Sequence, residues 1–325
     1  MNRLTTFLML IVPFCVSLAT PRVSAQPYPS RAIKLIVGGA PGSVPDTMAR
    51  PVADRLAVAL GQPVVVEDRP GAAGIIAMEA LSRSAPDGYT LALATMSQAV
   101  FDSYLFSRLP YDPLRDLEPV TTLVTGSMAL AAHPSFPARS LQEFVALAKT
   151  QPGKLFISMP QTGSPPHIVA LLLSRATGIE VTMVAHSSGT DAINAVLSGE
   201  IPLIIDAPTI ISPQVQAGKL RALAVTGRQR EDALPDTPTV RESGFPTVDG
   251  EAWIGLVAPA GTPAAVVRRL NGEIATILRT AEMQNLMARL SFRIMTSTPE
   301  EFRKLIRDDH TKWSAVIRNA GLKLD

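Results

Sequence analysis

The stretch "KLIVGGAPGSVPDTMAR" (residues 34–50) joins an apolar run to a segment with helical character. The loop between them holds three glycines, which allow other groups to approach the backbone closely, and two prolines, which lack an amide hydrogen. A loop of this composition either turns tightly for packing or presents bare backbone to a ligand. The rest of the chain has to decide between these two interpretations.

The same order of strand, small-residue loop and helix recurs along the chain. It appears as "VGGAPGSVPD" (37–46), "ATMSQA" (94–99), "SMPQTGSPPH" (158–167) and "HSSGTD" (186–191). Such loops leave amide groups at a helix N-terminus unpaired, where the helix dipole favours negative charge, and they bind carboxylates or phosphates without a basic side chain. Each loop taken alone favours a plain turn with a cap, but four together on one two-lobed chain favour binding.

Short β-like runs alternate with helical stretches over the whole chain. Strands that are apolar on both faces and separated by helices predict parallel, doubly covered sheets, and the length favours two α/β lobes. Within residues 34–50, Asp46 is a candidate helix N-cap, and Pro51 predicts either a kink or a helix that begins near Arg50. The expected strands are 32–37, 63–68, 89–95, 127–133, 154–159, 180–186, 201–206 and 220–226, and the expected helices are 47–60, 75–84, 141–149, 167–177, 191–198, 210–217, 263–279, 281–289 and 299–319.

The N-terminus has the pattern of a secretory signal peptide. A positive start is followed by "FLMLIVPFCVSLA" (7–19), which is too short to span a bilayer comfortably, and "VSA" ends at Ala25 with the small-x-small cleavage pattern. A membrane anchor is the alternative. We therefore expect residues 1–25 to be a signal peptide and the protein to be periplasmic.

Composition excludes several classes of function. Removal of residues 1–25 takes away Arg3 and Arg22 and no acidic residue, so the formal charge of +2 falls to zero. No basic field remains for nucleic acid or an anionic membrane. Cys15 is the single cysteine and lies in the signal segment, so the exported chain has no disulfide, thiol nucleophile or cysteine metal site.

Catalytic motifs are missing from the sequence. The four histidines (133, 167, 186 and 310) show no metal-ligand spacing, and the sequence has no phosphate-binding P-loop, no GxGxxG and no GxSxG elbow. A serine hydrolase without a local signature is the remaining enzymatic alternative. We expect no enzyme activity, no cofactor and no metal.

Several stretches, in order and spacing, resemble the Bug family, the extracytoplasmic solute receptors of tripartite tricarboxylate transporters. These include "LGQPVVVEDRPGAAG" (60–74), "APDGYTLALAT" (85–95), "LPYDPLRDLEPVT" (109–121) and "LVAPAGTPAAVVRRLN" (256–271). The resemblance runs from Tyr28 to Asp325. It implies an α/β, type II periplasmic-binding-protein fold with two lobes around a central ligand cleft. The implied division is 26–127 for the first part of lobe 1, 128–250 for lobe 2, and 251–325 for the helical return to lobe 1.

The resemblance also implies the residues of the site. The loop 38–46 matches at Pro41, Gly42 and Asp46, whereas Gly39 replaces an aromatic residue, Ser43 a glycine and Pro45 a hydroxyl residue. These departures imply a different or bulkier acid. The residues implied to bind ligand are Gly39, Ala40, Gly42, Ser43, Ser97, Gln98, Gln161, Thr162, Gly163, Ser164, His167 and Asp206.

Individual members of that set have alternative roles. His167 is equally readable as a helix-cap or packing residue, and Trp253 as inter-lobe packing or a wall of the cleft. Asp206 matches an acidic residue at a strand end, where it would orient the neighbouring loop by accepting amide hydrogen bonds. His186 and Ser187 stand where tyrosine and lysine are common in the family, which would change specificity if they faced the ligand.

The expected function is the capture of a small organic or amino acid by its carboxylate and its delivery to membrane permease subunits, with the receptor acting as a monomer. The alternative is a periplasmic ligand sensor that acts through a signalling partner. Both would use the same cleft and the same export signal.

Overall fold

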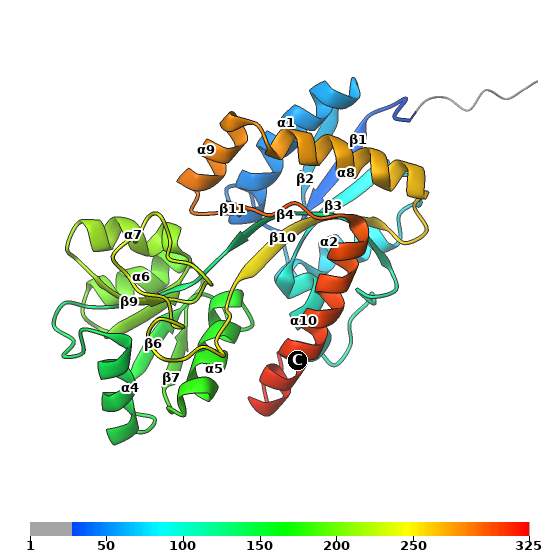
Figure 1. Ribbon diagram of the computed structural model, residues 1–325. Coiled ribbons are helices and arrows are strands. Elements are labelled where there is room, and N and C mark those ends of the chain that lie inside the picture. The colour runs from blue at the N-terminus through cyan, green and yellow to red at the C-terminus, as the bar shows by residue number, and fades with distance from the viewer. Residues whose placement is uncertain (1–27, 325) are drawn as a thin grey trace, which may run out of the picture.

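The computed structural model describes residues 28–324, and the expected signal segment, including Cys15, lies outside them. Two mixed β-sheets, each covered by helices, form the centres of two lobes, seen on the right and left of Figure 1. The chain passes from lobe 1 to lobe 2 after Gly126 and returns before Ala252. Both passages lie between strands of different sheets, which supports the boundaries 127/128 and 250/251 that we propose.

Lobe 1 is built on a six-stranded sheet in the order β11-β4-β10-β3-β1-β2. Strand β1 pairs in parallel with β2 and β3, whereas β10 runs antiparallel to both β3 and β4. The strands are β1 (Ile33–Val37), β2 (Val64–Asp68), β3 (Thr90–Thr95), β4 (Leu117–Gly126), β10 (Ala252–Pro259) and β11 (Arg293–Ile294).

Helices cover both faces of this sheet. One face packs against α1 (Val44–Leu60), α8 (Ala264–Leu278) and α9 (Ala281–Arg289) through an apolar core. The other face is covered by α2 (Ile75–Ser82), the short α3 (Asp102–Leu105) and the long C-terminal α10 (Pro299–Asn319). A 3₁₀ turn, η1 (Ala72–Gly74), and a π-turn, η2 (Ser97–Phe101), precede α2 and α3.

Lobe 2 repeats this plan on a five-stranded sheet in the order β7-β6-β8-β5-β9. Its strands are β5 (Ala129–Ala132), β6 (Phe156–Met159), β7 (Thr182–Ala185), β8 (Leu203–Asp206) and β9 (Arg221–Val225). Its helices are α4 (Leu141–Thr150), α5 (Pro165–Thr177), α6 (Gly189–Leu197) and α7 (Pro208–Gln216). Strand β5 is antiparallel to β8 and β9, so this sheet is mixed as well.

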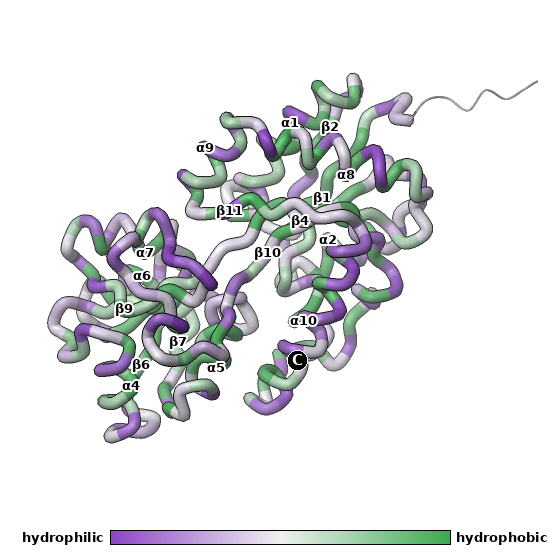
Figure 2. The backbone as a smooth tube through the Cα atoms, viewed as in Figure 1, coloured by the Kyte–Doolittle hydropathy of each residue, from purple (hydrophilic) through white to green (hydrophobic). Residues whose placement is uncertain are grey.

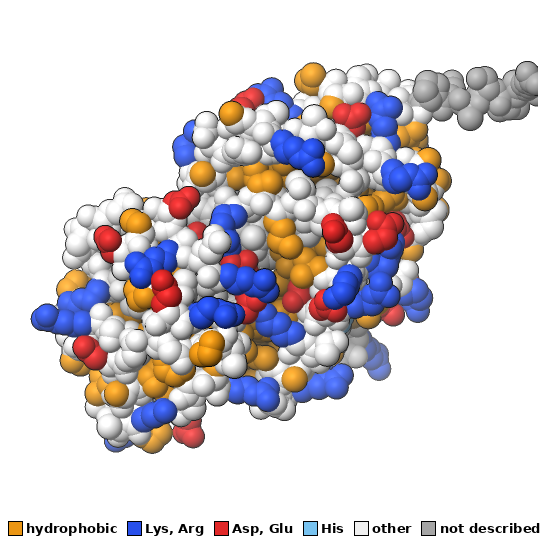
Figure 3. Space-filling model, in the orientation of Figure 1, with side chains coloured by type: hydrophobic (Ala, Val, Ile, Leu, Met, Phe, Trp, Pro, Cys, Tyr) orange, Lys and Arg blue, Asp and Glu red, His pale blue; other side chains and the backbone are white. Residues whose placement is uncertain are grey.

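The prediction of parallel sheets was therefore only partly correct. The strands that follow the two passages between lobes, β5 and β10, enter their sheets against the direction of their neighbours. Helices α1 and α9 alternate hydrophilic and hydrophobic segments in Figure 2. Acidic and basic side chains lie next to one another on the face seen in Figure 3, in keeping with the nearly balanced charge.

Helix α1 differs from its prediction at the N-terminus. It begins at Val44, with Ser43 as the N-cap, and continues through Pro51. Asp46 is the third helical residue rather than the cap, and its Oδ2 accepts a hydrogen bond from the amide of Gly42 at 2.7 Å. The prediction was wrong because Pro45 fits the first turn, where a missing amide hydrogen costs nothing.

The two lobes also touch away from the passages. Helix α10 of lobe 1 packs beside α5 of lobe 2, and one hydrophobic cluster continues across both. None of the helices within residues 28–324 combines the length and apolar character that a membrane crossing requires.

Candidate ligand-binding site

A cavity of about 320 Å³ lies between the lobes. Its walls come from the start of α1, the turn after β3, the two passages of the chain, the starts of α5 and α7, and the loop between α9 and β11. In open α/β folds, ligands bind at the carboxyl ends of strands, where the following helices begin. The ends of β3 and β8 lie on this cavity, at Thr95 and Asp206.

Three α-helices begin at the cavity, and each has proline in its first turn. Pro45 is the second residue of α1, Pro165 and Pro166 are the first two of α5, and Pro208 is the first of α7. Proline suits these positions because the first amides of a helix have no partner within the helix. The same prolines reduce the number of amide donors that face the cavity.

The N-cap serines of α1 and α5 are unusual in this chain. The hydroxyls of Ser43 and Ser164 make no cap hydrogen bond and are buried without a partner. An N-cap side chain bonds the second or third amide of the helix, and here the second residue is proline in both helices. The N-caps of the other capped helices accept from the third amide, namely Ser140, Ser188, Thr280 and Thr298.

Asp46 has its charge compensated beside the start of α1. Its Oδ1 lies 2.7 Å from the guanidinium of Arg50, which also bonds Asp68 at 2.8 Å. Burial alone would raise the pKa of Asp46, but the amide of Gly42 and the guanidinium of Arg50 outweigh it and hold the pKa below its ordinary value. This carboxylate is therefore ionised, and Arg50 is occupied.

Asp206 is the ionisable side chain on the cavity wall. Its Oδ1 accepts from the amide of Ala207 at 2.7 Å, whereas Oδ2 is buried without a partner. Burial raises the pKa of Asp206 to about 6, and the amide of Ala207 opposes the rise. Gly189, at the start of α6, leaves room for the carboxylate, because a Cβ placed there would come 2.5 Å from Oδ2.

Four of the residues expected to bind ligand line this cavity: Ser97, Gln161, Ser164 and Asp206. Gly39, Ala40, Gly42 and Ser43 lie in the loop just before the lining residues Val44 and Pro45. The space beside Gly39 does not widen the cavity, since a Cβ there would meet the Ser43 hydroxyl at 2.2 Å and the Pro45 ring at 3.0 Å.

Two expected glutamine side chains have partners within the protein. The Gln98 Oε1 accepts from the amide and the hydroxyl of Thr95 at 2.7 and 2.9 Å, and Nε2 donates to the carbonyl of Ala73 at 3.3 Å. This side chain joins the end of β3 to the η1 turn. Gln161 lies on the cavity, and its Nε2 donates to the carbonyl of Ser187 at 3.0 Å.

His167 closes the loop before α5. Its Nδ1 accepts from the amide of Gly163 at 3.0 Å, and burial lowers the pKa of the imidazole to about 4, so the ring is neutral. Thr162 and Gly163 belong to that loop. Gly163 has φ +81°, and the side chains of Leu105 and Leu324 from lobe 1 occupy the space beside it.

Sequence reasoning missed most of the apolar wall. Met96, Met128, Ile254, Leu290 and Phe292 line the cavity. Only position provided a signal for two of these residues, since Met96 directly follows β3 and Met128 precedes β5 at the passage into lobe 2. Trp253 also lines the cavity, and its ring is fixed by other groups, as described below.

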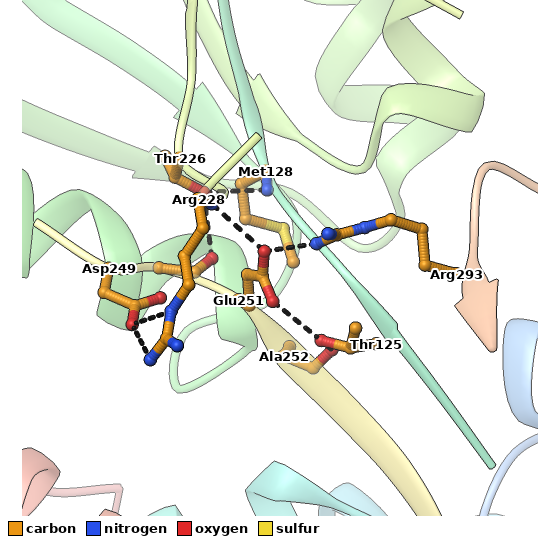
Figure 4. A network of polar contacts seen from close by, with 9 residues as sticks. Thr125, Met128, Thr226, Arg228, Asp249, Glu251, Ala252 and Arg293 are labelled. Carbon is orange, nitrogen blue, oxygen red and sulfur yellow. Dashed lines mark hydrogen bonds and ion pairs between the residues drawn. The ribbon is translucent and has the colours of Figure 1, made fainter. Parts of the chain in front are cut away.

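The two passages between the lobes are tied together next to the cavity. The hydroxyl of Thr226 accepts from the amide of Met128 at 2.9 Å and donates to the carbonyl of Gly250 at 2.8 Å. Glu251 accepts from the guanidinium of Arg293, from the amide of Arg228 at 3.1 Å and from the hydroxyl of Thr125 at 3.3 Å, as Figure 4 shows. This network joins strands of lobe 1 to the return segment from lobe 2.

The protein has two α/β lobes, two passages of the chain between them, and helices that begin at a cavity between the lobes. These features define the class of two-lobed solute-binding proteins. A sequence profile described as tripartite tricarboxylate transporter family receptor matches residues 48–322. The chain belongs to this family. Family members are periplasmic solute-binding receptors and not enzymes.

Individual relatives agree with this assignment. Protein BugT of Bordetella pertussis is 33% identical over 303 residues, which are 93% of each chain. A solved structure of Rpa4515 from R. palustris with adipate is 28% identical, with a TM-score of 0.80 over 91% of this chain and 100% of that one. MatC from Rhodopseudomonas palustris with bound malate is 29% identical, with a TM-score of 0.76 over 89% of this chain and 100% of that one.

Proposed function

We propose that this protein captures a small carboxylate-containing molecule in the cavity between its lobes and delivers it to the membrane permease of a tripartite tricarboxylate transporter. The observation that carries the proposal is the meeting of three helix starts, α1, α5 and α7, on one inter-lobe cavity. Amides at helix starts favour anions. The acids adipate and malate bound to the related structures support the same ligand class.

The proposed site comprises the cavity residues Ser97, Gln161, Ser164 and Asp206 together with the loop 39–43 next to them. In the dry space between closed lobes, each amide–carboxylate hydrogen bond is stronger than in water. Neither proton transfer nor a covalent step is needed. Within residues 28–324, no cluster of His, Cys, Asp or Glu has the arrangement of a metal site.

Isothermal titration calorimetry of the purified protein against a panel of organic and amino acids tests ligand capture. We expect saturable binding of at least one acid and no binding of neutral sugars. Binding only of sugars or of cationic peptides would contradict the proposal.

Delivery to a permease needs a separate test. Deletion of the gene should abolish uptake of the acid that binds, and expression of the protein should restore it. Intact uptake combined with a lost transcriptional response to the acid would instead indicate a sensor. We also propose that the receptor is a monomer, which light scattering at micromolar concentration tests.

A further inference from the structure

We propose that the cavity prefers an organic acid with a single carboxylate, an apolar body and a hydrogen-bond donor directed to Asp206, over a small dicarboxylate. This inference rests on the proposed function and names the ligand class of the same site. It follows from the donors, the walls and the charge of the cavity, taken in turn.

The helix-start amides that remain suffice for about one carboxylate. The first three positions of α1, α5 and α7 comprise nine residues, of which four are proline. The amide of Ile210 already donates to the carbonyl of Ala207 at 3.0 Å. The amides left are those of Val44, Asp46, His167 and Thr209, of which Val44 and Thr209 belong to residues that line the cavity. One carboxylate offers about four lone-pair sites. A second carboxylate would have few amides to meet.

The walls favour an apolar body. Met96, Met128, Ile254 and Phe292 line the cavity, and the rings of the four prolines add carbon surface. Trp253 presents no free donor, because its Nε1 donates to Asp309 at 2.7 Å. Transfer of apolar ligand surface from water to such walls lowers the free energy, whereas a carboxylate there would lose its hydration without compensation.

The charge of the cavity opposes a second anion. Asp206 is the sole ionisable residue among those that line it. The guanidinium of Arg50 is paired with Asp46 and Asp68, and that of Arg293 with Glu251. A dicarboxylate would therefore place its second charge near Asp206, where neither of these guanidiniums is free to compensate it, and like charges repel.

Asp206 also requires a donor. The residue is 5% exposed and its Oδ2 has no partner, and a buried acceptor without a partner is costly. A hydroxyl, amide or ammonium group on the ligand would satisfy it. The ligand then bridges the helix starts and Asp206, with its apolar part against the walls between them.

Two matched series of acids test this by calorimetry on the wild-type protein. One series is benzoate, 4-hydroxybenzoate and terephthalate, and the other is hexanoate, 6-hydroxyhexanoate and adipate. We expect the hydroxy acid of at least one series to bind tenfold or more tightly than its dicarboxylate, and neither series to show the reverse order. If terephthalate or adipate binds most tightly, the proposed function stands and this inference is overturned. If no acid binds, both fall.

Two variants test the cause of the preference. Asp206→Asn retains the acceptor for the Ala207 amide and removes the charge, so the affinity for the dicarboxylate relative to the hydroxy acid should rise at least fivefold. Pro45→Ser restores an amide in the first turn of α1 and should shift the same ratio in the same direction. Asp308→Asn, on the exposed face of α10, is the matched control and should leave the ratio unchanged. An unchanged ratio in every folded variant, checked by thermal unfolding, would overturn the inference.

Discussion

The indole Nε1 of Trp253 donates a hydrogen bond to Oδ2 of Asp309 at 2.7 Å. Trp313 donates to the other oxygen, Oδ1, at 3.2 Å. These are the two tryptophans of the chain, and one buried carboxylate of α10 holds both of them. Burial raises the pKa of Asp309, and the two indole donors oppose that rise. The C-terminal helix α10 thus fixes the position of Trp253, which lines the cavity.

Asp309→Asn should destabilise the protein. The amide nitrogen of asparagine would face an indole N–H, so a buried donor would lose its acceptor, at a cost of about 1–3 kcal/mol. Urea unfolding followed by tryptophan fluorescence measures the change. Asp308→Asn, at an exposed neighbouring position paired with Lys304, should change stability by less than about 0.5 kcal/mol. Equal stability of the two variants would contradict the role of Asp309.

Ligand binding should be visible in the emission of Trp253 alone. Trp253 lines the cavity, whereas Trp313 is fully buried and packs edge-on against Phe101 at 5.4 Å. Trp313→Phe should keep the ligand-induced change in fluorescence, and Trp253→Phe should abolish it. The cavity would be misplaced if the change followed Trp313 instead.

Gly189→Ala should weaken ligand binding without unfolding the protein. The new Cβ would lie 2.5 Å from Oδ2 of Asp206 and would displace the carboxylate. The residue does not have positive φ, so no backbone strain is expected. Gly272→Ala is the matched control, since that helical position has open space and alanine favours the helix by about 0.5–1 kcal/mol. Calorimetry should show weaker binding of the acid only for the Gly189 variant.

Most core strands of both lobes were predicted, because strands such as β1, β3 and β8 are largely apolar and end in small-residue loops. The central strand β10 of lobe 1 was not among the expected strands. Strand β4 was not, because it contains buried threonines whose partner lies far along the chain. Thr121 donates to the carbonyl of Ser297 at 2.9 Å, and Thr122 bonds the hydroxyl of the same residue at 3.0 Å. No local pattern reveals a polar strand residue that is satisfied by such a distant segment.

The parts of the site formed by local backbone segments were predictable, and the parts formed by residues distant in sequence were not. The loop before α5 and the strand end at Asp206 have local signatures of small residues and helix caps. Phe292 has no such signature, because it reaches the cavity only through the return of the chain to lobe 1. There its ring lies so close to Gly126 that a Cβ added to this glycine would be 3.0 Å from the ring. The division of N-cap serines into bonded and unbonded hydroxyls also required the structure.

Asp102 should make stability fall as pH rises. Its carboxyl is buried, neither oxygen has a partner, and burial raises its pKa to about 8. The pKa in the unfolded chain is about 3.9. Between these values the folded protein holds a proton that the unfolded chain has lost, so the contribution of Asp102 to stability is largest below pH 4 and falls by about 1.4 kcal/mol per pH unit until about pH 8.

Asp102→Asn removes this contribution. Other groups titrate over the same range, so the informative quantity is the difference in unfolding free energy between variant and wild type. That difference should move in favour of the variant from pH 4 to pH 8. The neighbouring Tyr111 is not expected to contribute, because burial raises its pKa above this range and its hydroxyl already donates to the carbonyl of Gln98. A difference that stays constant with pH would show that the Asp102 carboxyl is solvated.

The ion pair of Glu251 and Arg293 should couple the lobe connections measurably. Their side chains are 18% and 35% exposed, and Glu251 also accepts from the amide of Arg228 and the hydroxyl of Thr125. Glu251→Gln and Arg293→Met in a double-mutant cycle should give a coupling energy of about 1 kcal/mol that decreases in 1 M NaCl. The control cycle on Lys304 and Asp308, which are 73% and 60% exposed, should give less than about 0.5 kcal/mol. A coupling no larger than that of the control would contradict this role of the ion pair.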